Sequence, residues 1–537
     1  MNNQKIAHLL FGAGFVVCLL YIWLPGYFIT GDGPCHVYNA QVLHDLWCNK
    51  NTAFYSRFYT VVYQPNPNWL STVAIALLLL IVNGIIAEKI FLTVYVVVYV
   101  GGFYLLLSKI SKAGPYFLLA IFIFVFPQTL SKGFYNFSFS IAFYFWVVWA
   151  WLGFLDKKNI GTALLFLLFT SFIFFTHLLA FIFAAVTCAA LLLSYAIARE
   201  SMNERKLNWL FKNALMLLLL LSPFIVLMNW FTNKEGGMQL QPGFHPYRLL
   251  ELLQCKYLVN VVHTEDLIVL IAGVTIMLLF GFCALRFKEK LSINKYDGLL
   301  LGLLFVLFVY LVFPESFLGK LILISMRVQV FVLLLIVCSV AYLPAPAKVK
   351  TAGALVLFAC FIGVSIARIS CLIAASPAVA DYVSAQDRIK PYAVVLPLDF
   401  SPNGIDEHGK IIADRNFLFY HASQYMGTSK PMIILDNYEA NMGYFPVCWT
   451  DNTNPYKYLS RDGGLEATPP SASIAGYKQS SGVTVDYILM WCYNPSFLQN
   501  EHFRELYVEV NAGYHLAYTS ASGRTTLFER NVTHERR

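Results

Sequence analysis

Long, unbroken runs of apolar side chains dominate the pattern of this chain. The clearest runs occupy residues 6–24, 213–231, 265–284, 298–313, 321–342 and 352–374. Most are close to the ~20 residues that a helix needs to cross the hydrocarbon of a bilayer. The shorter ones can be accommodated by tilt, a kink or local thinning of the bilayer. The pattern therefore predicts a polytopic bundle of transmembrane helices, a mainly α fold surrounded by lipid.

Composition agrees with this prediction. Of 537 residues, 58% are hydrophobic and only 13% are charged, with a mean hydropathy of +0.61. Soluble globular proteins carry about 25% charged residues. The net charge of +8 does not indicate a nucleic-acid partner, because membrane topology accounts for the positive residues.

The positive residues are distributed unevenly among the loops. Twelve Lys or Arg lie in four short loops, at residues 156–159, 199–212, 286–295 and 344–350. Seven lie in almost three times that length, at residues 25–69, 128–137, 232–264 and 314–320. Because positive loops stay inside, the first group is expected to be cytoplasmic and the second extracytoplasmic. The first apolar run ends in Leu-Pro-Gly-Tyr rather than a cleavage site, so we interpret it as a retained signal anchor with a cytoplasmic N-terminus.

One segment does not fit a simple alternation. Two apolar runs, 70–86 and 88–108, separate an outside loop from Lys109 and Lys112, which indicate an inside loop. Two full crossings would return the chain to the wrong side. One run must therefore be a half-span, a re-entrant piece or two short helices, and we expect 11 to 13 spans in all.

Composition changes near residue 375, which predicts a transmembrane domain over 1–375 and a soluble extracytoplasmic domain over 376–537. Strand-like runs occur at 392–398, 432–435 and 485–491, followed by a hairpin-like pair at 514–519 and 525–529, and helical patterns fit 414–425 and 496–508. This second part is expected to be a small mixed α/β domain. Cys448 and Cys492 could pair within it.

The first outer loop contains the stretch TGDGPCHVYNAQVLHDL, residues 30–46. Gly33 and Pro34 predict the start of a helix that runs to Trp47. Its apolar stripe suits a helix lying along the outer membrane interface. Asp32 would stand just before the helix start, where backbone N–H groups favour an anion.

Other polar residues are expected on the same side of the membrane. His177 falls where the run from 160 to 198 must turn outward, and Arg327 lies near the outer end of a span. Lys132, Tyr135 and Asn136 occur in SKGFYNFSF, and Arg248 lies in the loop 232–264. Ionisable groups at membrane depth usually face a cavity or a partner. Plain structural roles are open for each: a helix-start acid, a His bonded to a backbone carbonyl, an Arg that extends to the interface.

The layout resembles the GT-C class of integral-membrane glycosyltransferases, which includes bacterial aminoarabinose transferases for lipid A and protein O-mannosyltransferases. The resemblance rests on the signal anchor, Asp32 in the first outer loop, the helix after it, many short spans and a C-terminal outer domain. The stretches GDGPCHVYNAQ, KGFYNF and THLLAF also look like bacterial membrane proteins grouped with that class.

The resemblance implies transfer of a sugar from a polyprenyl-phosphate donor to an extracytoplasmic lipid, glycan or protein, with inversion, in a bacterial inner membrane. Asp32 would be the general base. Arg327, helped by Arg248 or Lys132, would hold the phosphate. The other candidate substrate contacts are His36, Tyr38, Tyr135, Asn136 and His177.

A bound metal is a separate question. Many members of the class carry two adjacent acidic residues, where this chain has Asp32 alone. His36, one helical turn on, is the second candidate ligand for a divalent cation, Mg²⁺ or Mn²⁺.

Two other functions remain open. A transporter or lipid flippase would use the same cations to bind a phosphate headgroup without chemistry, and a sensor or scaffold would leave Asp32, His177 and Arg327 without a role. In the outer domain, residues 435–449 combine acidic and aromatic side chains, which suits either contact with an acceptor sugar or a packed aromatic turn.

Overall fold

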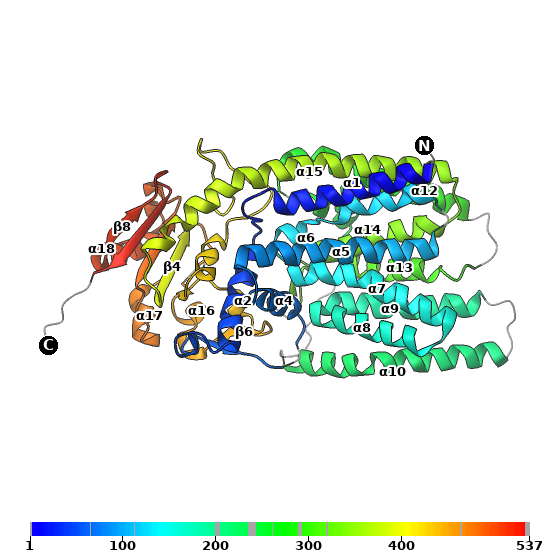
Figure 1. The fold of residues 1–537 in the computed structure, drawn as a ribbon, viewed down its shortest axis with the longest axis horizontal. Helices are drawn as coiled ribbons and strands as arrows, with labels where there is room; N and C mark the ends of the chain where they lie inside the picture. The colour runs from blue at the N-terminus through cyan, green and yellow to red at the C-terminus, as the bar shows by residue number, and fades with distance from the viewer. Residues whose placement is uncertain are drawn as a thin grey trace.

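The computed structural model describes residues 3–531 apart from residues 65, 112, 199–203, 235–242, 260, 288–292, 318–320 and 462–463. Part of the loop 232–264 therefore lies outside the described residues. Long helices run side by side along the molecule, and a smaller part with the sheet closes one end (Figure 1).

Among the described residues, eight helices are long and apolar enough to cross a membrane. They are α1 (Asn3–Trp23), α5 (Gly84–Ile110), α7 (Tyr135–Lys157), α9 (Leu178–Ile197), α10 (Glu204–Lys234), α12 (Asp266–Phe287), α14 (Ile324–Tyr342) and α15 (Ala347–Val383). Three shorter apolar segments accompany them: η1 (Pro115–Phe124) with α6 (Gln128–Ser131), α8 (Ile160–Thr176) and α13 (Gly298–Val312). The fold is mainly helical, as predicted, and compatible with an integral membrane protein. Among the described residues the eight candidate spans are fewer than the expected 11 to 13.

The loops sort into two ends. Asp156 forms ion pairs with Lys109 at 2.9 Å and with Lys295 at 3.4 Å. These contacts bring three separate segments of the chain together. The N-terminus lies at this end, and the C-terminal sheet lies at the other (Figure 1). These three residues and the N-terminus therefore lie at the end of the bundle opposite the sheet.

The difficult segment between residues 70 and 108 contains one short and one long helix. α4 (Leu70–Leu78) has nine residues, and at 1.5 Å per residue it is far too short to cross a bilayer. α5 has 27 residues and begins at a cap in which Asn83 Oδ1 accepts from the Ile86 N–H at 3.0 Å. The first of the two apolar runs is therefore the half-length one.

The predicted helix after Asp32 is confirmed as α2 (Gly33–Trp47). It stands across the end of the bundle, between the long helices and the C-terminal part (Figure 1). The expected interfacial position is wrong in one respect: most of α2 is buried in protein, including its polar residues His36 and Asn39. Its apolar stripe packs against α4, α5 and the C-terminal part instead of lipid.

The C-terminal part contains a five-stranded sheet in the order β5-β4-β7-β9-β8. The strands are β4 (Ala393–Asp399), β5 (Met432–Ile434), β7 (Tyr487–Trp491), β8 (Tyr514–Thr519) and β9 (Thr525–Arg530). β5, β4 and β7 are parallel, and β9 and β8 complete the sheet as an antiparallel pair. These strands confirm the predicted ones closely.

Helices and short turns surround the sheet. They are α16 (Pro455–Tyr458), α17 (Ile474–Ser481), α18 (Glu501–Gly513), η4 (Ser384–Arg388), η5 (Ala422–Thr428), η6 (Glu439–Asn441), η7 (Asp451–Thr453) and η8 (Pro495–Gln499). The helix expected over 496–508 is present as α18, but that expected over 414–425 is wrong, because only the 3-10 turn η5 forms there. The expected boundary at residue 375 falls inside α15, which continues to Val383. The proposed Cys448–Cys492 pair is also wrong, since the two cysteines form no disulfide.

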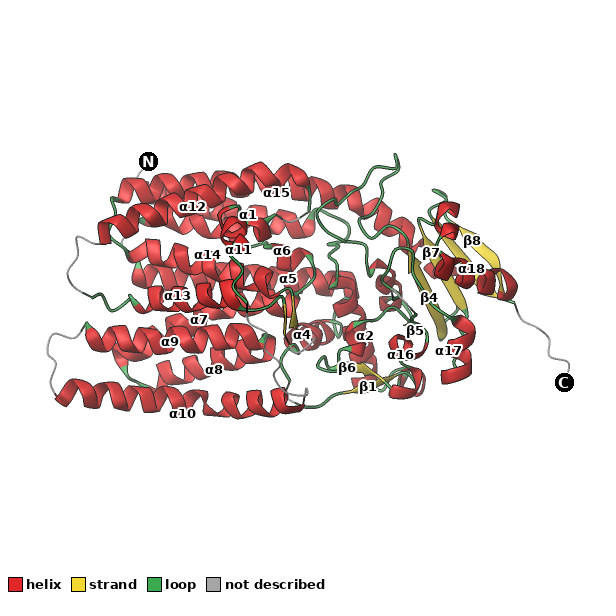
Figure 2. Ribbon diagram, turned by 180° about the vertical axis from the view of Figure 1, so that it is seen from behind, coloured by secondary structure: helices red, strands yellow, loops and turns green. Residues whose placement is uncertain are grey.

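The first loop and the C-terminal part are joined by a small sheet. β1 (Tyr59–Val61) pairs antiparallel with β6 (Val447–Trp449), with Thr60 opposite Cys448. Figure 2 shows this pair beside α2, between the bundle and the five-stranded sheet. The remaining short elements are α3 (Thr52–Tyr55), α11 (Tyr247–Leu253), η2 (Lys256–Leu258), η3 (His263–Glu265), β2 (Ser316–Phe317) and β3 (Leu321–Ile322).

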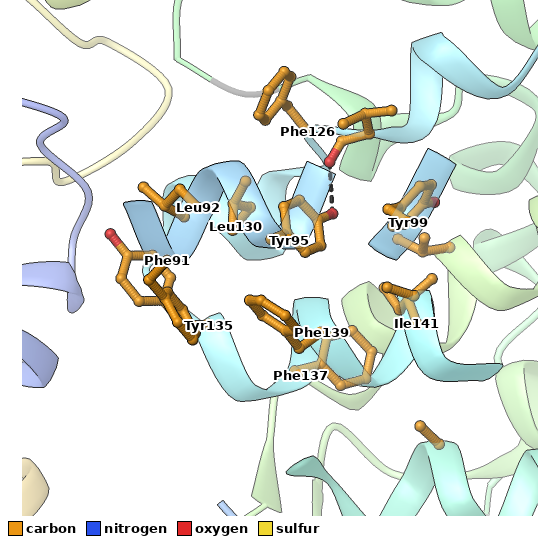
Figure 3. Packing of buried hydrophobic residues seen from close by; sticks show 14 of the residues in the cluster. Phe91, Leu92, Tyr95, Tyr99, Phe126, Leu130, Tyr135, Phe137, Phe139 and Ile141 are labelled. Carbon is orange, nitrogen blue, oxygen red and sulfur yellow. Dashed lines mark hydrogen bonds between the residues drawn. The ribbon is translucent and has the colours of Figure 1, made fainter. Parts of the chain in front are cut away.

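Aromatic side chains of α5 pack against those of α7 in the core of the bundle (Figure 3). Phe91 and Phe139 lie with ring centroids 4.6 Å apart, and Tyr95 packs beside Phe139 at 5.3 Å. The Tyr95 hydroxyl donates to the Val125 carbonyl oxygen at 2.6 Å. One helical turn on, the hydroxyl of Tyr99 is buried and has no partner among the described residues.

This difference predicts that two matched substitutions, Tyr95→Phe and Tyr99→Phe, differ in their effect on stability. Tyr95→Phe leaves the buried Val125 carbonyl unpaired, so we expect a loss of about 1–3 kcal/mol in the free energy of unfolding. Tyr99→Phe removes a hydroxyl that has no partner and should be neutral or stabilising. Thermal unfolding of both variants in the same detergent checks this, and equal losses would contradict the assigned hydrogen bond.

Candidate functional site

The segment around Asp32 is held by backbone contacts with the end of α6. The Gly31 N–H donates to the Ser131 carbonyl at 3.0 Å, and the Asp32 N–H donates to the Lys132 carbonyl at 2.9 Å. Gly133 has a φ of +88°, and a Cβ added there would lie 2.4 Å from the Asp32 nitrogen. The two glycine-containing stretches, GDGP and SKGFY, therefore fit together only without side chains at this contact.

Asp32 occupies the N-cap position of α2, yet its side chain makes no capping hydrogen bond. Thr30 has that role instead, because its hydroxyl oxygen accepts from the Gly33 N–H at 3.0 Å. The same hydroxyl lies 3.1 Å from the hydroxyl of Tyr135, which donates to Glu88 at 2.6 Å. A purely structural role as helix cap therefore does not account for the Asp32 carboxylate.

Asp32 lines a cavity of about 440 Å³ at the junction of the bundle and the C-terminal part. That volume lies within the range of small-molecule sites. The expected residues that line it are Asp32, His36, Lys132, Tyr135, Asn136, His177 and Arg327. The C-terminal part contributes Asn416, Phe417, Tyr420, His421, Tyr438, Glu439, Met442, Tyr444, Phe445 and Glu466.

Several cationic or polar side chains face this cavity from the bundle. The guanidinium of Arg327 lies 4.5 Å above the Phe134 ring and 5.7 Å from that of Phe137. The ammonium of Lys132 lies 5.9 Å above the Phe417 ring. Burial lowers the pKa of Lys132, and the negative charge of Asp32 partly offsets this. Cations fixed over aromatic faces are well placed to bind an anionic ligand.

The electrostatic surroundings make Asp32 a stronger base than an exposed aspartate. Burial raises its pKa above the ordinary value near 4, an effect that His421 and a hydrogen bond from Tyr438 partly oppose. A carboxylate with a raised pKa, in a cavity that also holds cations, is a recognised sign of a functional group.

His36 is bound through both ring nitrogens. Nε2 lies 2.9 Å from the Gly133 carbonyl, and Nδ1 lies 2.9 Å from Glu439. Burial alone would lower its pKa, but the charges of Glu439 and Asp32 prevail and raise it. Both ring nitrogens are therefore occupied, and the ring ties α2 to the C-terminal part.

This arrangement does not fit the proposed metal site at Asp32 and His36. Both nitrogens of His36 already face other partners, the Gly133 carbonyl and Glu439, and within the described residues no group of three or more His, Cys, Asp or Glu side chains could hold a metal ion.

Two expected residues lie away from the cavity. The Tyr38 hydroxyl donates to the Met432 carbonyl at 2.9 Å, so it packs under the C-terminal sheet. Arg248 is fully buried and binds the Tyr310 and Phe313 carbonyls and Glu315. Neither is placed to contact a ligand there, and sequence position alone could not show it.

Two others line the cavity but have structural bonds as well. Asn136 accepts from the Ser71 N–H at 2.9 Å and donates to the Asn68 carbonyl at 3.0 Å, which fixes the start of α4. His177 caps α9, because its Nδ1 accepts from the Leu179 N–H at 3.2 Å. The hydrogen bonds of Asn136 and His177 therefore mainly fix the shape of the cavity wall.

The sequence did not predict most of the cavity lining that the C-terminal part contributes. His421, Tyr420 and Glu466 were not expected there, although the acidic and aromatic stretch 435–449 does contribute Tyr438, Glu439, Tyr444 and Phe445. That composition was the one available signal.

A second carboxyl lies nearby at the end of β4. Burial raises the pKa of Asp399 to about 8, and the Asp436 charge adds to this, while the Ser401 N–H and His421 oppose it.

Between about pH 4 and pH 8 the folded state binds more protons at Asp399 than the unfolded state does, so the free energy of unfolding should fall as pH rises. Asp399→Asn should flatten this dependence and the exposed Asp451→Asn should not. Melting temperatures from pH 5 to pH 8 check it, and parallel curves for wild type and Asp399→Asn would contradict it.

Comparison with known proteins gives no matching family model and no matching curated protein. The site must therefore be interpreted from its own geometry and chemistry.

Proposed function

We propose that this protein is a membrane glycosyltransferase of the GT-C type. It transfers a sugar from a polyprenyl-phosphate donor to an extracytoplasmic lipid, glycan or protein, in a bacterial inner membrane with the C-terminal part outside. The observation that carries the proposal is the position of Asp32: a half-buried carboxylate, without a capping role, lines one cavity together with Lys132 and Arg327.

The chemistry that this arrangement supports is a single displacement. Asp32 accepts the proton of an acceptor hydroxyl while that oxygen attacks the anomeric carbon. The bond between the anomeric carbon and the phosphate oxygen breaks, and polyprenyl phosphate leaves with the bonding electrons. Attack opposite the leaving group inverts the anomeric configuration.

Residues of this chain supply both charge stabilisation and orientation. Arg327 and Lys132 offset the negative charge that develops on the leaving phosphate. The aromatic walls, Phe134, Phe417 and Tyr438 among them, exclude water and offer flat faces to a sugar ring.

The proposal is tested with the full-length protein in lipid nanodiscs. We expect transfer of labelled sugar from at least one donor of a polyprenyl-phosphate panel to an envelope lipid, glycan or protein fraction. The same preparation in liposomes is assayed for movement of a fluorescent lipid phosphate between leaflets. Movement without transfer would show a lipid transporter and refute the enzyme.

A further inference from the structure

The parallel strands of the C-terminal sheet end beside the cavity. Asp399 is the last residue of β4, and Asp436 follows β5 by two residues. In parallel sheets, functional side chains gather at the carboxyl ends of the strands. His421, which lies in the connection between β4 and β5, reaches both this edge and the cavity.

Contacts fix His421 from two sides. Its Nδ1 lies 3.6 Å from Asp436 Oδ2, and its ring stacks on that of Tyr438 with centroids 4.9 Å apart. Asp436 is itself held, because the Ser423 hydroxyl donates to it at 3.1 Å. With only 3% of its surface exposed, the imidazole of His421 has one orientation.

Tyr438 links this pair to Asp32. One face of its ring carries His421, and its hydroxyl is close enough to the Asp32 carboxyl to lower the pKa of that group. The two titratable groups come from opposite ends of the sequence, yet they line the same cavity.

We propose that His421, oriented by Asp436, is a positioning residue that keeps Asp32 ionised, so that the C-terminal part completes the site for proton transfer. The proposal rests on the proposed function, since Asp32 is the base of that reaction. A cation near a buried carboxylate stabilises its charged form.

The charges around His421 agree with this role. Burial alone would lower its pKa, but Asp436, Asp32 and Glu466 outweigh that and raise it to about 8. The neighbouring rings of Tyr420 and Tyr438 complete its surroundings. At neutral pH His421 is therefore a cation that faces Asp32's cavity.

A titration of His421 tests the pairing without any enzyme assay. Coupling between two groups is reciprocal, so the effect of His421 on Asp32 equals that of Asp32 on His421. The eleven histidines are labelled with ¹³C in the full chain, and His421→Gln identifies the signal of interest. We expect Asp32→Asn and Asp436→Asn each to move the midpoint of the His421 titration to lower pH. Asp45→Asn, on α2 but outside the cavity lining, should leave it unchanged.

An unchanged His421 midpoint in Asp32→Asn would overturn the proposal, whether or not the protein transfers sugar. The second readout is the pH profile of kcat/KM in His421→Gln. Loss of the imidazolium should shift the acidic limb, which reports ionisation of Asp32, to higher pH. A lower rate with an unshifted limb would also overturn the proposal, because it would show a merely structural role.

Discussion

Asp32→Asn is expected to lower kcat for sugar transfer by about 10²–10⁴-fold, the usual contribution of a general base. The amide keeps the size of the side chain but cannot take the proton of the acceptor hydroxyl. Because Asp32 makes no capping bond, the folded state should tolerate the change. Initial rates with saturating donor measure the effect.

Asp45→Asn is the matched control for this experiment. Asp45 is a buried carboxylate of α2, but it binds Gln41 and Asn51 and does not line the cavity. It should retain transfer within a few-fold of wild type. Wild-type kcat in Asp32→Asn, or equal losses in both variants, would rule out Asp32 as the base.

Gly133→Ala is expected to have the second largest effect, although Gly133 has no side chain in the cavity. Its Cβ would meet the backbone nitrogens of Asp32 and Gly33 at 2.4 and 2.6 Å, and backbone cannot move aside as a flexible side chain does. The Asp32 segment must therefore shift, which should abolish transfer and lower the melting temperature.

Gly114→Ala separates this clash from backbone strain. Gly114 has a similar φ of +83°, but no heavy atom of the described residues lies within 4 Å of an added Cβ. Both variants carry the roughly 1–2 kcal/mol cost of an L side chain in the left-handed region. Only Gly133→Ala should lose transfer. Equal activity in the two variants would show that the close contact between Gly133 and Asp32 does not affect function.

Much of the fold follows from local patterns in the sequence. Apolar runs near 20 residues define the long helices, Gly33-Pro34 starts α2, and alternating or β-branched runs define β4, β5 and β7. The uneven Lys and Arg content predicts two groups of loops. These features depend on residues close together in the chain.

The candidate site depends on contacts that no local pattern specifies. Asp32, His177 and Arg327 could be placed on one side of the membrane, and they do line one cavity. Arg248 was assigned to the same side, yet it is buried against Glu315, because loop position does not fix the direction of a side chain. His421 meets the cavity only through the docking of the C-terminal part, so it was not predicted.

The most direct measurement is a cryo-EM structure of Asp32→Asn with a polyprenyl-phosphate sugar bound in nanodiscs. We expect the phosphate within hydrogen-bonding distance of Arg327 or Lys132, and the anomeric carbon facing residue 32 with room for an acceptor hydroxyl between them. A donor bound outside this cavity, or one whose sugar points away from residue 32, would contradict the account.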